Sequence, residues 1–362
     1  MLDFKIIDSG ANEVKPEQLR HLALSGRYGY SQQGVYGENV IAAVVDTGVA
    51  QNHPELDGRV VEWLNFSGYG QGYDDNGHGT HVAGTIAGTN VGIANKGKIL
   101  SVKVLDGTGG GNFNNIIKAL ETLVSWRSRD GKKVTLASMS LSAPASLFNS
   151  EQLTRFHNAI KTLVANGIAV ICSAGNTGSQ EIRYPAYFAE PITVSAVDPE
   201  NLSPASFTTL SNEVDVAQCG IDIASAWFQG GYAIMSGTSM STPIVSGIAL
   251  LIADKFYQLF KQPIPEQVLY WMLKMNTKDL LVKGVDVVTG AGFCSLQPVS
   301  LDLYTKQGNM HWTLNKENAP LIAPIVVIPP GVTSLPARKF IEEGMGGIVS
   351  WNPETLFARF RL

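Results

Sequence analysis

The sequence predicts an α/β fold in which a central parallel sheet lies between two layers of helices, as a three-layer sandwich. Two observations support this prediction. Short runs rich in β-branched residues are almost continuously apolar, and segments with the spacing of amphipathic helices lie between them. Because strands that are apolar throughout are buried on both faces, they favour a parallel sheet covered by helices.

The predicted elements alternate along the chain. Strands are predicted at 40–46, 98–105, 134–141, 167–174 and 191–197. Helices are predicted at 114–130, 153–167, 239–260 and 265–275. Asn166-Gly167 is expected to end the second helix, because glycine readily adopts the left-handed conformation found there. Pro265 suits the first turn of the last helix, where its missing N–H costs nothing.

The alternation of strands and helices ends near residue 301. Beyond it, short apolar segments broken by proline and glycine surround one helical pattern. We therefore predict a small α+β module over 301–362, too short to bury a large core by itself.

Charge and cysteine content exclude several function classes. The chain has 27 Lys and Arg against 31 Asp and Glu, a net charge of −4, with no basic patch, so no nucleic-acid partner is expected. Its three cysteines are widely spaced and predict neither a disulfide framework nor a metal site. No secretory signal or membrane span is predicted. We expect a cytoplasmic protein as synthesised, with a surface or extracellular location only by a non-standard route.

Asp46 is the first candidate for chemistry. It follows the apolar run 40–45 and precedes Thr47-Gly48. The carboxyl end of a parallel strand is where α/β proteins build their sites. The same pattern is also a common turn signal, so taken alone it supports a catalytic role and a turn role equally.

His78 is the second candidate, and it lies between two glycines in NGHGTHVAGTIAG (76–88). A single histidine is more often structural than catalytic. His81 adds an HxxH pattern, but the glutamate and spacing of known zinc helices are missing. We therefore expect a packing role for His81 and no metal.

Ser239, in GTSMSTPIVSG (237–247), is the third candidate and begins the predicted long helix. A serine there is ordinarily a helix cap. However, the free N–H groups of a helix start also suit a developing oxyanion beside a nucleophilic hydroxyl. Serine needs a histidine to take its proton, and the histidine needs a carboxylate to orient it and stabilise its charge. Asp46, His78 and Ser239 supply these three groups.

Together, VVDTGV (44–49) and the two blocks around His78 and Ser239 resemble the signature blocks of subtilisin-like serine proteases (subtilases, peptidase S8), in the family's order. The resemblance runs from about residue 28 to 296. It implies a seven-stranded parallel core and a serine endopeptidase that works through an acyl-enzyme. On this basis the chain divides into an extension at 1–27, a catalytic domain at 28–300 and the C-terminal module.

The resemblance also implies roles for further residues. SAGNTG (173–178) is similar to the family's oxyanion segment, so Asn176 is expected to donate to the oxyanion beside the N–H of Ser239. DGTGGG (106–111) and SMSLSA (138–143) resemble the two edges that hold an extended peptide. The expected substrate-binding residues are Gly107, Gly109, Ser140, Leu141, Ser142, Ala174 and Gly175.

Some positions depart from the family pattern. Ser142, followed by Ala143, stands where the family usually has glycine after Ser-Leu, so the primary specificity pocket is expected to be narrower or more polar. The segment 82–102 lacks the length of a calcium-binding loop, and Glu55 replaces an aspartate that often binds calcium. No cofactor is expected for the chemistry, and structural Ca²⁺ is left open. The short extension, with its apolar FKII, raises the hypothesis that residues 1–20 block the cleft.

The tail bears a second resemblance, to the stalk-type module named after the copper amine oxidase N-terminal domain. Residues 350–355 (SWNPET) fit its W-N/D-x-x-T element. No copper ligands occur, so we expect a spacer or a module that binds a protein or surface partner.

Two other functions were weighed. An aspartic protease also contains an Asp-Thr-Gly turn, but it needs two of them, and no second Asp-Thr/Ser-Gly follows an apolar strand. The alternative from another class is a protease-like scaffold with a binding or assembly role. Degenerate enzymes of that kind usually lose a catalytic residue, whereas all four are present here.

Overall fold

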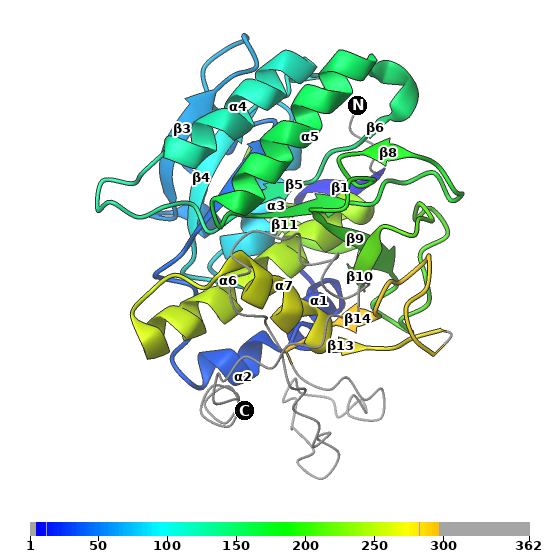
Figure 1. Ribbon diagram of the computed structural model, residues 1–362. Helices are drawn as coiled ribbons and strands as arrows, with labels where there is room; N and C mark the ends of the chain where they lie inside the picture. The colour runs from blue at the N-terminus through cyan, green and yellow to red at the C-terminus, as the bar shows by residue number, and fades with distance from the viewer. Residues whose placement is uncertain (1–4, 12, 282, 297–362) are drawn as a thin grey trace.

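The computed structural model describes residues 5–11, 13–281 and 283–296. The predicted C-terminal module at 301–362 lies outside the described residues. Within them, a nine-stranded sheet crosses the middle of the molecule (Figure 1). From edge to edge its strands are β13 (Thr277–Lys278), β14 (Phe293–Cys294), β10 (Val214–Cys219), β9 (Ile192–Val197), β7 (Ala169–Ser173), β5 (Leu136–Met139), β2 (Ile41–Asp46), β4 (Lys98–Lys103) and β3 (Val60–Asn65).

The seven strands from β10 to β3 are all parallel, as predicted. The two-residue strands β14 and β13 extend this core at one edge, and β13 is antiparallel to its neighbour. All five predicted strands are present, as β2, β4, β5, β7 and β9. Strands β3 and β10 were not predicted from the sequence.

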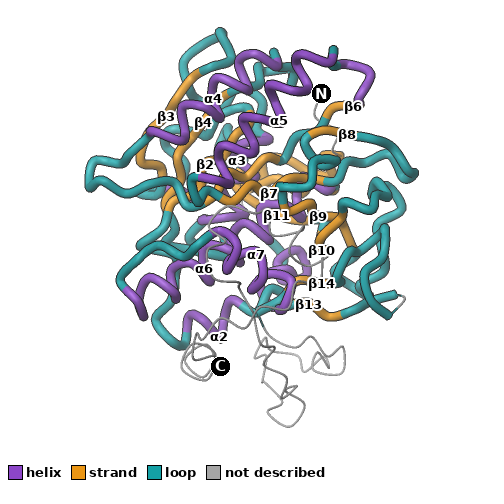
Figure 2. Tube along the Cα trace, viewed as in Figure 1, coloured by secondary structure: helices purple, strands orange, loops and turns teal. Residues whose placement is uncertain are grey.

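Helices cover both faces of the sheet (Figure 2). One layer contains α4 (Phe113–Ser125) and α5 (Ser150–Ala165). The other contains α1 (Arg20–Leu24), α2 (Arg27–Ser31), α3 (His78–Ala87), α6 (Thr238–Phe260) and α7 (Glu266–Met275). Single 3₁₀ turns occur at Pro16–Leu19, Pro54–Leu56 and Ala145–Leu147.

Strand β2 shows why its sequence is continuously apolar. Ala42 and Val44 pack into the hydrophobic core on the side of α3 and α6. The residues that alternate with them pack into the core on the side of α4 and α5. Both faces of the strand are therefore buried, which confirms the three-layer sandwich.

Local signals explain where the helices begin and end. The side chain of Asn149 caps α5 by accepting from the N–H of Gln152 at 2.8 Å. The same helix ends at Asn166, and Gly167 follows with φ +77°, as the sequence predicts. In the described part of the chain, α6 alone has the length and apolarity of a membrane span, but 72% of its apolar window is buried, as in a core helix of a globular protein.

Two small antiparallel sheets lie beside the main one. In the first, β1 (Lys5–Ala11) pairs with β12 (Tyr232–Ser236), which also pairs with β11 (Ile223–Ala226). In the second, β6 (Ala143–Pro144) pairs with β8 (Arg183–Tyr184). Strand β12 leads directly into α6, and β6 follows the segment after β5, so both small sheets border the predicted site.

Candidate functional site

Asp46 is the last residue of β2 and is fully buried. Its Oδ1 accepts from the backbone N–H of Thr47 at 2.7 Å and lies 2.7 Å from Nδ1 of His78. A carboxylate can only accept at this position, so Nδ1 of His78 carries the proton. Nε2 is then the nitrogen without a proton, and it is the one that can act as a base. The carboxylate thus sets the tautomer of the imidazole.

His78 is the first residue of α3 and is also fully buried. Its flanking glycines are required by close packing. A Cβ at Gly79 would lie 2.1 Å from the carbonyl oxygen of Gly48, and a Cβ at Gly77 would lie 2.3 Å from the ring of Trp227. Gly79 therefore lets the start of α3 approach the end of β2 and Asp46 closely, and Gly77 leaves room for the ring of Trp227.

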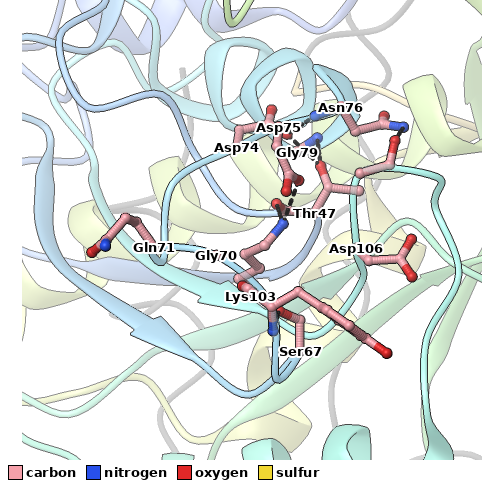
Figure 3. Close-up of polar contacts among 12 residues, drawn as sticks. Thr47, Ser67, Gly70, Gln71, Asp74, Asp75, Asn76, Gly79, Lys103 and Asp106 are labelled. Atoms are coloured by element: carbon pink, nitrogen blue, oxygen red, sulfur yellow. Dashed lines mark hydrogen bonds and ion pairs between the residues drawn. The ribbon is translucent and has the colours of Figure 1, made fainter.

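Asp74 organises the turn before His78 and was not singled out from the sequence. Its Oδ1 accepts from the hydroxyl of Thr47 at 2.8 Å and from the N–H of Gly77 at 2.9 Å. Its Oδ2 accepts from the N–H and the hydroxyl of Thr80 at 2.9 and 2.6 Å. This carboxylate ties the residue after Asp46 to the first turn of α3 (Figure 3).

Lys103 is a second residue that the sequence reasoning missed. It ends β4, directly opposite Asp46 in the parallel register, and its side chain is fully buried. Its Nζ donates to the carbonyl of Thr47 and to Oδ1 of Asp75, both at 2.6 Å (Figure 3). A buried ammonium needs such partners to offset its desolvation. The available signal was a lysine near the end of the mostly apolar run 98–105.

Ser239 is the second residue of α6, and 4% of its surface is exposed. Its hydroxyl donates to the carbonyl of Ser140 at 3.1 Å, and the hydroxyl of Ser140 donates to the carbonyl of Ser239 at 2.9 Å. Ser140 follows β5, the strand beside β2. Ser239 and the Asp46–His78 pair therefore lie at the carboxyl ends of neighbouring strands.

Asn176 lies beside the start of α6. Its side-chain oxygen accepts from both the N–H and the hydroxyl of Thr238, each at 2.9 Å. The hydroxyl of Thr238 in turn accepts from the N–H of Gly175 at 3.1 Å. Because a backbone N–H can only donate, the amide oxygen must face Thr238, and the amide N–H groups point the other way.

His81 has the packing role that was expected. Its Nε2 lies 3.0 Å from the carbonyl of Ile223 and 3.2 Å from that of Ala233, so it donates to both strands of the β11–β12 hairpin. Burial lowers the pKa of His81 to about 3 and keeps the ring neutral. The described residues contain no group of three or more His, Cys, Asp or Glu side chains that could hold a metal ion.

The predicted substrate-binding residues lie around these groups. Ser142 is buried after β5, and Arg183 donates to its hydroxyl at 3.0 Å. The N–H of Ala174 is bonded to the carbonyl of Val194, which anchors the segment before Asn176. Leu141 packs into the core on the side of α4 and α5.

The segment 106–111 forms a turn and not a regular strand. The N–H of Asp106 donates to the carbonyl of Gly110 at 2.8 Å, and Gly109 has φ +76°. Gly107 packs on the neighbouring loop, where a Cβ would lie 3.2 Å from Cγ of Asp75. A side chain at residue 107 would therefore be in tight contact with Asp75 even without a bound peptide.

Glu55 is buried, and both oxygens of its carboxylate accept hydrogen bonds from protein donors. Oε1 accepts from the amide of Asn90 and from the hydroxyl of Tyr232, both at 2.8 Å. Oε2 accepts from the N–H of Asn90 at 2.7 Å. The groups around the carboxylate are thus hydrogen-bond donors. A calcium ion bound there would instead need further oxygen ligands.

Comparison with known proteins bears on the family and the fold. A family model described as the subtilase family matches residues 37–292. The chain is 37% identical over 259 residues to an "Intracellular serine protease" of Paenibacillus polymyxa, covering 67% of this chain and 76% of that protein. It is 33% identical over 280 residues to the "Major intracellular serine protease" of Bacillus subtilis (strain 168), covering 73% and 83%. The solved structure of a cold adapted subtilisin-like serine proteinase matches with a TM-score of 0.59 and 30% identity, over 72% of this chain and 88% of that one.

Proposed function

The chain belongs to the subtilase family and is a serine endopeptidase, and from this premise we propose that Asp46, His78 and Ser239 are its catalytic triad. The observation that carries the proposal is the 2.7 Å contact between two fully buried side chains, the carboxylate of Asp46 and the imidazole of His78. Burial excludes water from this pair, so the carboxylate stabilises a positive imidazolium strongly.

In the proposed reaction, His78 removes the hydroxyl proton of Ser239 as Oγ attacks the carbonyl carbon of a peptide bond. The tetrahedral intermediate collapses to an acyl-enzyme while His78 gives the proton to the leaving amine. A water molecule then attacks the ester in the same way, and the proton returns to Ser239. Asp46 stays ionised throughout and holds the Nδ1–H tautomer.

Asn176 and the backbone N–H of Ser239 are proposed to stabilise the oxyanion. The bonds from Thr238 fix the amide oxygen of Asn176 and thereby direct its N–H groups away from α6. The N–H groups in the first turn of a helix have no partner within the helix. Both donors are held in place before the substrate arrives, which is the condition for effective oxyanion stabilisation.

A protein or peptide substrate is proposed to bind in extended form between the segments at 107–109 and 140–142. Residues 174–175 would border the side chain that precedes the cleaved bond. Main-chain pairing with such edges binds peptides with little dependence on sequence.

The chemistry is proposed to need no cofactor. At Glu55, we propose that protein donors take the place of a bound calcium ion, because Asn90 and Tyr232 already satisfy both carboxylate oxygens.

Labelling with a fluorophosphonate probe tests the triad. We expect the wild type to be labelled, and Ser239→Ala to be neither labelled nor active, with turnover lower by about 10⁶-fold, the loss known for the same change in subtilisin. Ser241→Ala is the matched control, because Ser241 is a buried serine of the same helix whose hydroxyl donates to the carbonyl of Thr238. Label on the Ser239→Ala variant would refute the assignment. A folded wild type without any label would favour the protease-like scaffold.

Two further proposals concern the setting of the enzyme. We infer that it works inside the cell, as the names of the two bacterial relatives say of those proteins. Recovery of the activity only from the culture medium would contradict this inference. The tail at 301–362 is proposed to bind a protein or surface partner, and a chain truncated at 300 should then keep its peptidase activity and lose that binding.

A further inference from the structure

Arg183 lies in the part of the site where a substrate side chain would be expected. It belongs to β8, whose pairing with β6 fixes Pro144 opposite Arg183. Its Nε donates to the hydroxyl of Ser142 at 3.0 Å, and Nη2 donates to the carbonyl of the same residue at 3.4 Å. On the opposite side its Cδ lies so close to Gly175 that a Cβ there would be only 2.6 Å away. The side chain therefore spans the space between two of the proposed substrate-binding segments.

The positions of Ser142 and Gly175 show which substrate side chain would lie between their segments. Ser142 is two residues beyond Ser140, whose carbonyl accepts from the hydroxyl of Ser239. Gly175 immediately precedes Asn176, the proposed oxyanion donor. A peptide attacked by Ser239 would place the side chain before the cleaved bond, the P1 side chain, between these segments. Arg183 thus places a cation between Ser142 and Gly175, where the P1 side chain would lie.

We propose that Arg183 makes the enzyme selective for an acidic P1 residue, aspartate or glutamate. The proposal rests on the proposed function, because it takes the position of the pocket from Ser239 and Asn176. Arginine is always charged and can bind a carboxylate through two N–H groups at once. A P1 carboxylate would therefore complete the contacts of the guanidinium.

Because Arg183 is largely buried, its positive charge can discriminate between P1 side chains. The side chain of Arg183 is 11% exposed, and its one ionic partner in the described structure is Glu181, at 3.4 Å. Both oxygens of Glu181 accept from Nη1 of Arg183 at 3.4 Å, but the side chain of Glu181 is 37% exposed, so solvent screens this ion pair. An apolar P1 side chain would displace water from the guanidinium without replacing its hydrogen bonds, and a basic one would be repelled.

Rates of cleavage on peptides that differ only at P1 test the proposal. We would compare kcat/KM for p-nitroanilides with Glu, Gln, Asp, Asn, Phe and Lys at P1. The wild type should prefer Glu over Gln and Asp over Asn by about tenfold or more, and added salt should reduce both ratios. Arg183→Gln should bring the ratios near one, and Arg183→Glu should favour Lys. Glu181→Gln should raise the preference for acids.

Control variants and labelling distinguish failure of the P1 proposal from failure of the proposed function. Arg129→Gln removes an exposed arginine from the turn before β5 and should leave the P1 preference unchanged. Labelling by the fluorophosphonate probe shows whether each variant still folds around its site. A labelled wild type that cleaves after Phe or Lys as fast as after Glu would overturn the P1 proposal and leave the triad intact. A wild type that is neither labelled nor active on any peptide would instead overturn the proposed function.

Discussion

Ser239 and Ser140 exchange hydrogen bonds in both directions, hydroxyl to carbonyl, at 3.1 and 2.9 Å. The second bond has a specific cause. In an α-helix the carbonyl of Ser239 would accept from the N–H of residue 243, but that residue is Pro243 and has no N–H. The hydroxyl of Ser140 supplies the missing donor, so the end of β5 and the first turn of α6 are bonded together at the proposed nucleophile.

The first prediction follows from this exchange. Ser140→Ala leaves the buried carbonyl of Ser239 without its donor, which should lower stability by about 1–3 kcal/mol. Because the same bond positions the nucleophile, kcat should also fall, by about tenfold or more. Ser246→Ala is the matched control, since the hydroxyl of Ser246 donates to Ser138 on the same strand at 2.9 Å, farther from the site. An equal effect of both changes on kcat would contradict the positioning role.

The second prediction concerns Asn176. Asn176→Leu should lower kcat by about 10²–10³ and leave KM nearly unchanged, because the amide is proposed to donate only to the oxyanion of the transition state. Labelling by the fluorophosphonate should slow in parallel, since the phosphonyl oxygen uses the same donors. If the change raised KM alone, Asn176 would contribute to substrate binding and not to the oxyanion.

The sequence predicted the helices and strands best where one hydrophobic pattern extends over many residues. The five continuously apolar runs and four amphipathic or apolar helices are all present. Strand β10 was missed because the buried Asp215 interrupts its apolar pattern. That carboxylate is satisfied by the hydroxyl of Tyr270 at 2.9 Å and the N–H of Thr193 at 2.9 Å, which are distant in sequence. Strand β3 was missed because it is an edge strand with only partial burial.

In the proposed site too, contacts between residues distant in sequence were not predicted. Short blocks predicted Asp46, His78 and Ser239 as candidate catalytic residues, since each block carries its own glycine or helix-start signal. The residues that hold them were not identified, because their partners come from elsewhere in the chain. Lys103 bonds to Thr47 and Asp75, and Arg183 bonds to Ser142, 41 positions away. Such contacts are a property of the folded chain and leave no local pattern.

The third prediction is a pH-dependent stability term from His81. Burial lowers its folded pKa from 6.5 to about 3, so the unfolded chain binds a proton below about pH 6.5 while the folded chain does not. The stability from neutral His81 is therefore complete above pH 6.5 and is lost as the pH falls. At pH 5 the loss is about 2 kcal/mol, from 1.36 kcal/mol per pKa unit.

Urea unfolding of His81→Gln measures this term, in a Ser239→Ala background that prevents self-digestion. The destabilisation relative to the parent should be about 2 kcal/mol smaller at pH 5 than at pH 7.5. The comparison of variant with parent cancels the pH-dependent contributions of other groups. One of these is Glu266: burial raises its pKa to about 8, and its contribution has the opposite direction. An identical difference at both pH values would refute the assignment.

The fourth prediction concerns Glu55. With both oxygens already bonded to protein donors, the wild type should unfold at the same temperature in calcium and in a chelator. Glu55→Gln should lower stability by about 1.5–3 kcal/mol, because it removes charge-assisted hydrogen bonds from Asn90 and Tyr232. Calcium stabilisation of the wild type that disappears in Glu55→Gln would show a metal site instead.

The fifth prediction concerns strand β1, which pairs with β12 in a register that sets Lys5 opposite Ser236. Ser236 is three residues before Ser239, so β1 occupies an edge that the leaving half of a peptide could pair with. A chain that starts at residue 13 should cleave long peptides severalfold faster than the full chain. Short substrates without residues beyond the cleaved bond serve as the control. Equal rates on long peptides would rule out inhibition by this strand.

The parallel sheet also has a consequence for attaching the enzyme to a support. Asp46 and Ser140 lie at the carboxyl ends of their strands, whereas the turns at Gly131 and Gly167 precede β5 and β7 at the amino ends. Both turns are open to solvent, with no atom within 4 Å of a Cβ placed at either glycine. A five-residue strand is about 16 Å long. A linker or surface anchored at these turns would therefore hold the molecule with its cleft facing outward.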